Sequence, residues 1–317
     1  MSPVIVELLS LVAGFVALIK GATWLVDGGA ALARQLGMRP MTIGLTVIAW
    51  GTSMPEIVVS GMAAFDGDPE ASLGNVLGSN IANVALVLGV TGLILPRVLG
   101  THVSPRDCLW LVGSLGILWG FLLDEALSRI EALALVSAFM IYTVTLFRTP
   151  RVEDVVAESS EHKARRPWLC IVVGTVAIAV GGRLVLYGAD GLAVRAGISQ
   201  RVIGLTIYAV GTSLPELAAS VQSALRGHPA MGMGNVVGSN IFNSLAAMGF
   251  AGLIGPFDGR ASDQILRALT LDFPTTLGFA LIVVLLPLFL RNRGSRLAAL
   301  ALVLGYAGYI GRVFLTG

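Results

Sequence analysis

The feature that most constrains this chain is an internal duplication. The segment IGLTVIAWGTSMPE at residues 43–56 returns as IGLTIYAVGTSLPE at 203–216, and GNVLGSNIAN at 74–83 returns as GNVVGSNIFN at 234–243. Over 52 ungapped positions that include both motifs, the two copies are identical at 26. Shared composition alone does not give so many identities, so the sequence predicts two copies of one structural unit.

Each copy holds five long apolar runs, in a chain that is 55% hydrophobic and only 13% charged. A bilayer core of ~30 Å takes about 20 apolar residues in a helix, so runs of this length are typical of membrane spans. The runs lie near 4–26, 41–64, 71–95, 108–123 and 130–147, and near 168–188, 202–225, 231–254, 273–290 and 297–315. We therefore expect an all-α membrane protein with ten transmembrane helices.

The number of spans in each copy determines how the copies are related. Five is odd, so the second copy must enter the membrane from the opposite side, which predicts two inverted five-helix repeats at 1–150 and 165–317 joined by a linker at 151–164. Loops on the side of the linker carry 13 of the 21 Lys and Arg residues. The positive-inside bias then places the linker in the cytoplasm and both termini outside.

Two carboxylates lie deep inside expected spans. Glu56 is about 15 residues into the span that starts near residue 41, and Glu216 holds the same place in the second copy. A charged side chain at that depth costs a few kcal/mol unless partners solvate it, so an acidic residue there is a candidate functional residue. A protonated or structurally paired Glu is the alternative, but it leaves the mirrored pair unexplained.

Other oxygen atoms are expected beside each carboxylate. Thr52 and Ser53 precede Glu56 by four and three residues, so one helix face carries all three side chains. Pro55 cannot donate an N–H to the preceding turn, which predicts released backbone carbonyls near Ala49. These hydroxyls could also bond back to their own helix, and the proline could merely kink it. The further members of the candidate set are Ser79, Asn83, Thr212, Ser213, Ser239, Asn243 and the carbonyl of Ala209.

The chemistry of this set favours a hard cation. Ligands that are all oxygen suit Ca²⁺ and can also serve Na⁺, whereas copper or zinc would call for Cys or His. The three histidines, His102, His162 and His228, all fall in expected loops, which disfavours an intramembrane metallohydrolase or serine protease. A channel stays open as an alternative. The net charge of +2 gives no sign of a nucleic-acid partner, and no cofactor is expected.

The two GTSxPE segments and the two GN-V-x-GSNI-x-N segments resemble the alpha repeats of the sodium/calcium exchangers, in the Ca²⁺/cation antiporter superfamily. The resemblance implies a central site between spans 2, 3, 7 and 8, where Glu56 and Glu216 coordinate Ca²⁺ and Na⁺ in turn with the oxygens named above. It also implies a slide of spans 1 and 6 across the other eight. A third Na⁺, which the resemblance implies, would exceed the charge of two carboxylates and make transport electrogenic.

Two departures from the family refine this expectation. Many relatives carry Asp where this chain has Asn243, and an acidic residue there is associated with K⁺, so the chain looks K⁺-independent. The linker has no room for the regulatory Ca²⁺-binding domains of animal exchangers, which favours a compact prokaryotic form in the inner (plasma) membrane, and a monomer is compatible with it. The alternative is an H⁺/Ca²⁺ (or other divalent) antiporter, although such relatives typically have GNxxE in place of GTSxPE.

Overall fold

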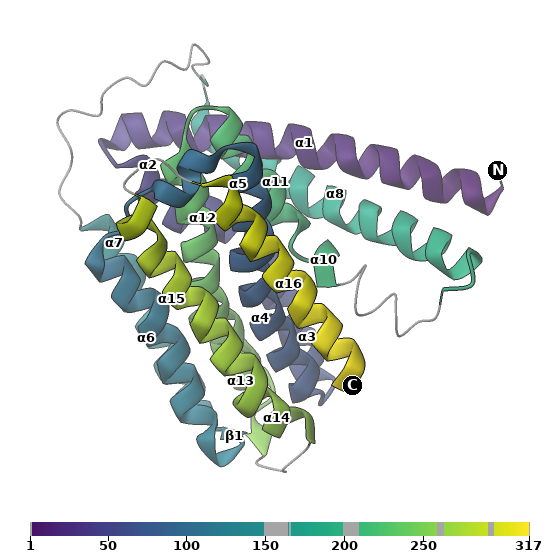
Figure 1. The fold of residues 1–317 in the computed structure, drawn as a ribbon, viewed down its shortest axis with the longest axis vertical. Coiled ribbons are helices and arrows are strands. Elements are labelled where there is room, and N and C mark those ends of the chain that lie inside the picture. Colours follow the sequence, from purple (N-terminus) through teal and green to yellow (C-terminus); the bar gives the residue numbers. More distant parts are fainter. Residues whose placement is uncertain are drawn as a thin grey trace.

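The structure is a computed structural model, and it describes residues 2–148, 164, 166–198, 209–258, 263–290 and 295–316. Helices dominate it (Figure 1). Nine helical segments among the described residues are long and apolar enough to cross a membrane. The expected span at 202–225 lies partly outside the described residues, and its remainder forms α10 (Ala209–Gly211) and α11 (Leu214–Leu225).

The elements follow the order expected for a duplication. The first half comprises α1 (Pro3–Leu36), α2 (Pro40–Ile43), the π-helix η1 (Gly44–Ile48), α3 (Ala49–Phe65), α4 (Pro69–Ala82), the π-helix η2 (Asn83–Leu88), α5 (Gly89–Ile94), the 3₁₀-helix η3 (Pro96–Gly100), α6 (Pro105–Phe121), the 3₁₀-helix η4 (Leu122–Asp124), β1 (Ala126–Leu127) and α7 (Arg129–Phe147). The second half comprises α8 (Pro167–Arg195), α10, α11, α12 (Pro229–Phe242), the π-helix η6 (Asn243–Ala247), α13 (Met248–Ile254), β2 (Phe257–Asp258), α14 (Asp263–Arg267), the π-helix η7 (Ala268–Asp272), α15 (Phe273–Leu290) and α16 (Arg296–Thr316). Strands β1 and β2 pair antiparallel.

Local sequence signals explain where the helices begin and end. Proline has no N–H to leave unsatisfied in the first turn, and it occupies the start of α1, α2, α4, α6, α8 and α12. At α7 a capping box satisfies the first backbone N–H groups. The Ser128 side chain accepts from the backbone N–H of Glu131, and the Glu131 carboxylate accepts from the backbone N–H of Ser128. Gly37 ends α1 in the left-handed conformation, at φ 64°.

The first helices of the two halves, α1 and α8, lie against each other and extend beyond the rest of the bundle (Figure 1). They run antiparallel, since Gly14 meets Gly181 and Gly21 meets Gly174. A Cβ added at Gly14 or Gly21 would come within 2.8 Å of backbone atoms of α8, so only glycine permits this approach. Equivalent helices that run in opposite directions are what an inverted repeat requires.

The span expected at 4–26 is too short. The helix α1 has 34 residues, about 51 Å at 1.5 Å per residue, which exceeds the bilayer core and is compatible with a tilted helix. It continues past Asp27, whose carboxylate pairs with Arg226 (Oδ1 to Nη1, 3.3 Å). At its other end, Glu7 pairs with Arg195 of α8 (Oε1 to Nε, 2.8 Å).

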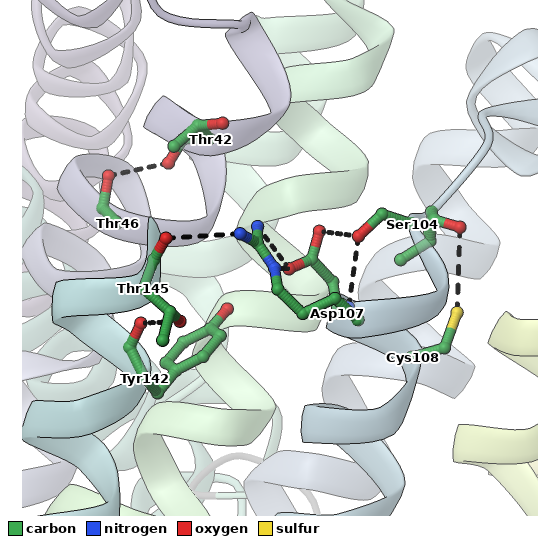
Figure 2. Close-up of polar contacts among 9 residues, drawn as sticks. Thr42, Thr46, Ser104, Asp107, Cys108, Tyr142 and Thr145 are labelled. Carbon is green, nitrogen blue, oxygen red and sulfur yellow. Dashed lines mark hydrogen bonds and ion pairs between the residues drawn. The ribbon is translucent and has the colours of Figure 1, made fainter. Parts of the chain in front are cut away.

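The centre of the molecule is formed by α4–α5 and α12–α13, whose spans are mostly buried, while α1 and α16 are mostly exposed. At the edge of the bundle, a polar cluster joins α6 to α7 (Figure 2). Asp107 accepts a hydrogen bond from Ser104 Oγ (2.6 Å) and another from Arg106 Nη2 (2.9 Å), and Arg106 Nη1 donates to the carbonyl of Thr145 (3.3 Å). The buried charge of Asp107 is therefore compensated within the cluster.

Candidate cation-binding site

The two carboxylates expected at the membrane midplane are fully enclosed and lie at one helix interface. Glu56 of α3 is 1% exposed, and Glu216 of α11 is 0% exposed. Ser53, one turn before Glu56 on α3, donates its hydroxyl to Glu216 Oε1 at 2.9 Å. The side chain of Ser53 thus links the Glu56 helix to the Glu216 carboxylate. Two buried carboxylates at one interface are stable only when protons or a cation compensate their charge.

Several buried polar atoms around this interface have no hydrogen-bond partner among the described residues. Both carboxylate oxygens of Glu56 and Oε2 of Glu216 are in this condition. So are the hydroxyls of Ser79, Ser213 and Ser239, Oδ1 of Asn83, and both amide atoms of Asn243. Buried polar atoms are normally paired, and each unpaired one indicates a missing partner such as an ion. These atoms therefore have unused hydrogen-bonding or coordinating capacity at a buried interface.

The elements that carry the two asparagines pack against elements of the other half. Asn83 begins η2, which contacts α11 and α12, and Asn243 begins η6, which contacts α3 and α4. The π-helix that begins at each asparagine thus packs against the carboxylate helix of the other half. No group of three or more His, Cys, Asp or Glu side chains capable of holding a metal occurs in the part of the chain that the structure describes. Ligands beyond the two carboxylates would therefore be neutral oxygens.

The remaining candidates take different positions. Thr52 Oγ1 donates to Asn235 Oδ1 at 3.1 Å and lies 3.3 Å from the carbonyl oxygen of Ala49. The Ala49 carbonyl is therefore within reach of a hydroxyl of its own helix. Thr212 lies in a two-residue turn between α10 and α11, and Ala209 lies in the described part of α10.

The prolines predict a backbone irregularity near Ala49 and near Ala209. In the second half the chain turns at Thr212 and Ser213, just before Pro215, but in the first half α3 runs unbroken through Pro55. Pro55 removes only one N–H, and the rest of the helix keeps its bonds. The irregular turn is instead the π-helix η1, which ends immediately before Ala49, and further π-helices begin at Asn83 and Asn243. Such π-turns are frequent at functional sites.

Sequence reasoning did not select the asparagines that brace the carboxylate helices. In the first half, Asn75 Nδ2 donates to the Glu56 carbonyl (3.5 Å) and to Ser60 Oγ (2.9 Å). The equivalent second-half residue, Asn235, makes the same two bonds at 3.2 Å and 2.9 Å. The signal was present, because these Asn and Ser residues are identical in both copies.

Comparison with known proteins covers both halves of the chain. The family model described as "Sodium/calcium exchanger protein" matches residues 6–148 and 166–315. CaxA of Alkalimonas amylolytica is 36% identical over 315 residues, which cover 93% of this chain and 95% of CaxA. Sodium/calcium exchanger MaX1 of Methanosarcina acetivorans is 29% identical over 326 residues, which cover 89% of this chain and 90% of MaX1.

The same likeness holds in three dimensions. The solved structure of the sodium-calcium exchanger NCX_Mj soaked with zero Na⁺ and Ca²⁺ has a TM-score of 0.80 and 28% sequence identity, and the match covers 98% of this chain and 99% of that chain. With nine described spans and α10–α11 at the place of the tenth, the expected fold of ten transmembrane helices in two inverted repeats is confirmed. The chain is a multi-pass membrane transporter of compact, prokaryotic size, and it belongs to the sodium/calcium exchanger family.

Proposed function

We propose that this protein is a secondary active antiporter that exchanges Na⁺ for Ca²⁺ by alternating access, electrogenically and without K⁺. The observation that carries the proposal is the pair of enclosed carboxylates, Glu56 and Glu216, with three of their four oxygens unpartnered among the described residues. MaX1 and NCX_Mj, which resemble the chain over most of its length, are both named sodium-calcium exchangers. One site that serves either ion in turn makes binding mutually exclusive, and alternating access converts this exclusion into exchange.

The proposed ligands divide into charged and neutral groups. Glu56 and Glu216 supply the two negative charges. The neutral oxygens come from the hydroxyls of Thr52, Ser53, Ser79, Thr212, Ser213 and Ser239, the amides of Asn83 and Asn243, and the carbonyls of Ala49 and Ala209. Such a set of hard oxygens suits Ca²⁺ and, with fewer ligands for each ion, Na⁺.

The charge of the site determines the electrical character of transport. Two ionised carboxylates balance one Ca²⁺ or two Na⁺, so a third Na⁺ leaves the loaded site with one net positive charge. Exchange of three Na⁺ for one Ca²⁺ then moves one charge across the membrane in each cycle. Asn243 is neutral, so the site lacks a third carboxylate for an additional K⁺.

Proton/Ca²⁺ antiport is the second candidate, and the unpartnered carboxylate oxygens also favour it. Two protons could neutralise Glu56 and Glu216 as two Na⁺ would, and neither Glu56 oxygen is occupied by another donor among the described residues. Exchange with protons alone would carry no net charge at a ratio of two to one. Charge movement therefore separates the two candidates.

We further propose that the chain lies in the inner membrane of a prokaryote. The repeats span 1–150 and 165–317, and the linker at 151–164 faces the cytoplasm, with both termini outside. The excess of Lys and Arg in the loops on the linker's side supports this orientation. Inner membrane protein YrbG of Escherichia coli strain K12 is 32% identical over 257 residues, which cover 78% of this chain.

Ion flux in reconstituted vesicles tests the proposal. Vesicles loaded with Na⁺ and diluted into Na⁺-free medium should accumulate ⁴⁵Ca²⁺, and an inside-positive potential should speed the uptake because one positive charge leaves in each cycle. Omission of K⁺ should change nothing. Uptake that requires an acidic interior and ignores Na⁺ would establish the proton antiporter. Uptake without any counter-ion gradient would indicate a channel and contradict both candidates.

A further inference from the structure

We propose that Asn240 is a positioning residue, which holds the Asn83 amide so that its oxygen faces the transported cation. The inference rests on the proposed function, since it assumes that Asn83 is a ligand, and it adds a residue that would contact no cation itself. Asn240 lies in α12 and Asn83 begins η2, so the two halves of the protein meet in this pair.

A backbone carbonyl determines the orientation of both amides. The Asn80 carbonyl can only accept hydrogen bonds, and Asn240 Nδ2 donates to it at 3.3 Å. Asn240 Oδ1 must then point the other way, where it accepts from Asn83 Nδ2 at 3.1 Å. Because Asn83 uses its nitrogen in this bond, its oxygen faces away from Asn240. That oxygen is buried and has no partner among the described residues.

Orientation matters because the two ends of an amide act oppositely on a cation. The oxygen carries a partial negative charge and can coordinate, whereas the NH₂ group carries a partial positive charge and repels. A free amide can rotate to offer either end. A second residue that pairs with the nitrogen removes this choice, and loss of such an outer partner typically lowers metal affinity by about 10–100-fold.

The second half shows what the amide looks like without this support. Neither amide atom of Asn243 has a partner among the described residues. By the repeat, the residue that corresponds to Asn240 is Asn80, and its Oδ1 is also unpartnered while its Nδ2 donates to Ser244 Oγ at 3.0 Å. Ser244 stands where the first half has Val84. In this structure, therefore, the orienting bond exists for one amide only.

Ca²⁺ binding and transport by the full-length protein test the role. Ca²⁺ affinity is measured from the Ca²⁺-dependent rise in unfolding temperature of purified protein without Na⁺, and apparent KM and maximal rate from ⁴⁵Ca²⁺ uptake. The variant Asn240→Leu should weaken Ca²⁺ binding by about 10–100-fold and raise KM, with the maximal rate changed less than about threefold. Asn240→Ala serves the same purpose if the leucine variant does not fold.

Two further variants separate positioning from general structural damage. Asn240→Asp can no longer donate to the Asn80 carbonyl but still accepts from Asn83, so Ca²⁺ affinity should stay at or above the wild-type value. In the Asn83→Leu background, Asn240→Leu should cause no additional loss of affinity, because the ligand it positions is gone. Asn80→Leu removes an equally placed buried amide and should change Ca²⁺ affinity less than about threefold.

Each outcome bears on the inference. Wild-type affinity in Asn240→Leu, a full additional loss in the double variant, or an equal loss in Asn80→Leu would each overturn it. Failure of the proposed function looks different: the wild-type protein would bind Ca²⁺ but show no Na⁺-driven uptake, and the affinity pattern of the variants would still support the role of Asn240. If the wild-type protein does not bind Ca²⁺ at all, both proposals are wrong.

Discussion

The two GTSxPE segments are almost identical in sequence, yet they fold differently. In the first half, α3 runs through Thr52 and Ser53 as one helix, whereas in the second half a turn at Thr212 and Ser213 separates α10 from α11. Glu216 receives a hydroxyl hydrogen bond, and Glu56 receives none among the described residues. The few substitutions between them, such as Met54 against Leu214, leave the local propensities nearly the same, so we attribute the difference mainly to tertiary packing.

The glycines of the two GN-V-x-GSNI-x-N segments also differ in their surroundings between the two halves. A Cβ at Gly238 would lie 2.7 Å from the carbonyl oxygen of Leu45, and one at Gly234 would lie 2.5 Å from that of Met41. Their first-half equivalents, Gly74 and Gly78, have nothing within 4 Å among the described residues. Among the described residues, α12 therefore packs directly against the backbone of the first half at these glycines, whereas α4 makes no such contact at its own. An antiporter with inverted repeats is expected to show such asymmetry in any single state, with the halves exchanging roles in the opposite state.

The largest expected effect concerns the two carboxylates, Glu56 and Glu216, for which we expect the two halves to be equivalent. Glu56→Gln and Glu216→Gln should each reduce Na⁺-driven ⁴⁵Ca²⁺ uptake on the order of 100-fold or more, because a buried charge that loses its partner costs about 3–5 kcal/mol. The control is Glu70→Gln, which alters a partly exposed carboxylate in the first turn of α4. Full activity in either variant would show that only one half holds the ion.

A second prediction addresses the closed and open glycine contacts. Gly238→Ala should lower the free energy of unfolding by about 1–3 kcal/mol, since the new methyl group meets the backbone of η1. Gly78→Ala should be neutral or stabilise by up to about 1 kcal/mol through helix propensity. Thermal unfolding of the purified variants measures both. Equal destabilisation would mean that the first-half glycine makes an equally close contact.

A third pair of substitutions compares the two amides. Asn83→Asp removes the donor to Asn240 Oδ1 and sets two acceptor oxygens against each other, while Asn243→Asp breaks no bond that the structure describes. Both add one buried charge, so their difference isolates the hydrogen bond. In buffer without Na⁺ or Ca²⁺, we expect Asn83→Asp to be the less stable variant by about 2 kcal/mol. The reverse order would place the fixed amide in the second half.

The smallest effect is expected at the serines. Ser53→Ala removes a hydrogen bond to the Glu216 carboxylate and should cost about 1 kcal/mol of unfolding free energy without cations. Ser213→Ala removes a hydroxyl that has no partner among the described residues and should cost nothing measurable. Chemical denaturation in a cation-free detergent buffer checks both values. If the two variants lose equal stability, the cation-free protein does not have a serine hydrogen bond at Glu216 that Glu56 lacks.

Much of the fold followed from simple patterns. Run length predicted the spans, the odd number of runs predicted inversion, and the antiparallel pairing of α1 with α8 agrees with it. Span ends were less predictable, because Asp27 interrupts the apolar run, and its ion pair with Arg226, which is distant in sequence, is visible only in the structure. The π-helices carry no sequence mark that we could read.

The candidate site also has residues that the sequence indicated and residues that only the structure showed. Glu56, Glu216 and Ser53 were selected from the sequence, and the structure places them at one interface, while their role as ligands stays a prediction. Asn235 and Asn240 were not selected, although both are identical in the two copies. Their roles are hydrogen bonds to Thr52, Asn80 and Asn83, and sequence spacing does not reveal bonds between different helices.

The sequence by itself determined that the chain lies in a lipid bilayer, that it is duplicated, and where a carboxylate lies in each copy. Hydrophobicity and repetition can be read directly from the order of the residues. Only the tertiary structure decided that one motif stays helical while its copy breaks, and that one amide is held while its counterpart is not. Those outcomes depend on which atoms of the opposite half lie within hydrogen-bond reach. Two nearly identical segments can meet different neighbours, since an inverted repeat need not be symmetric in every state.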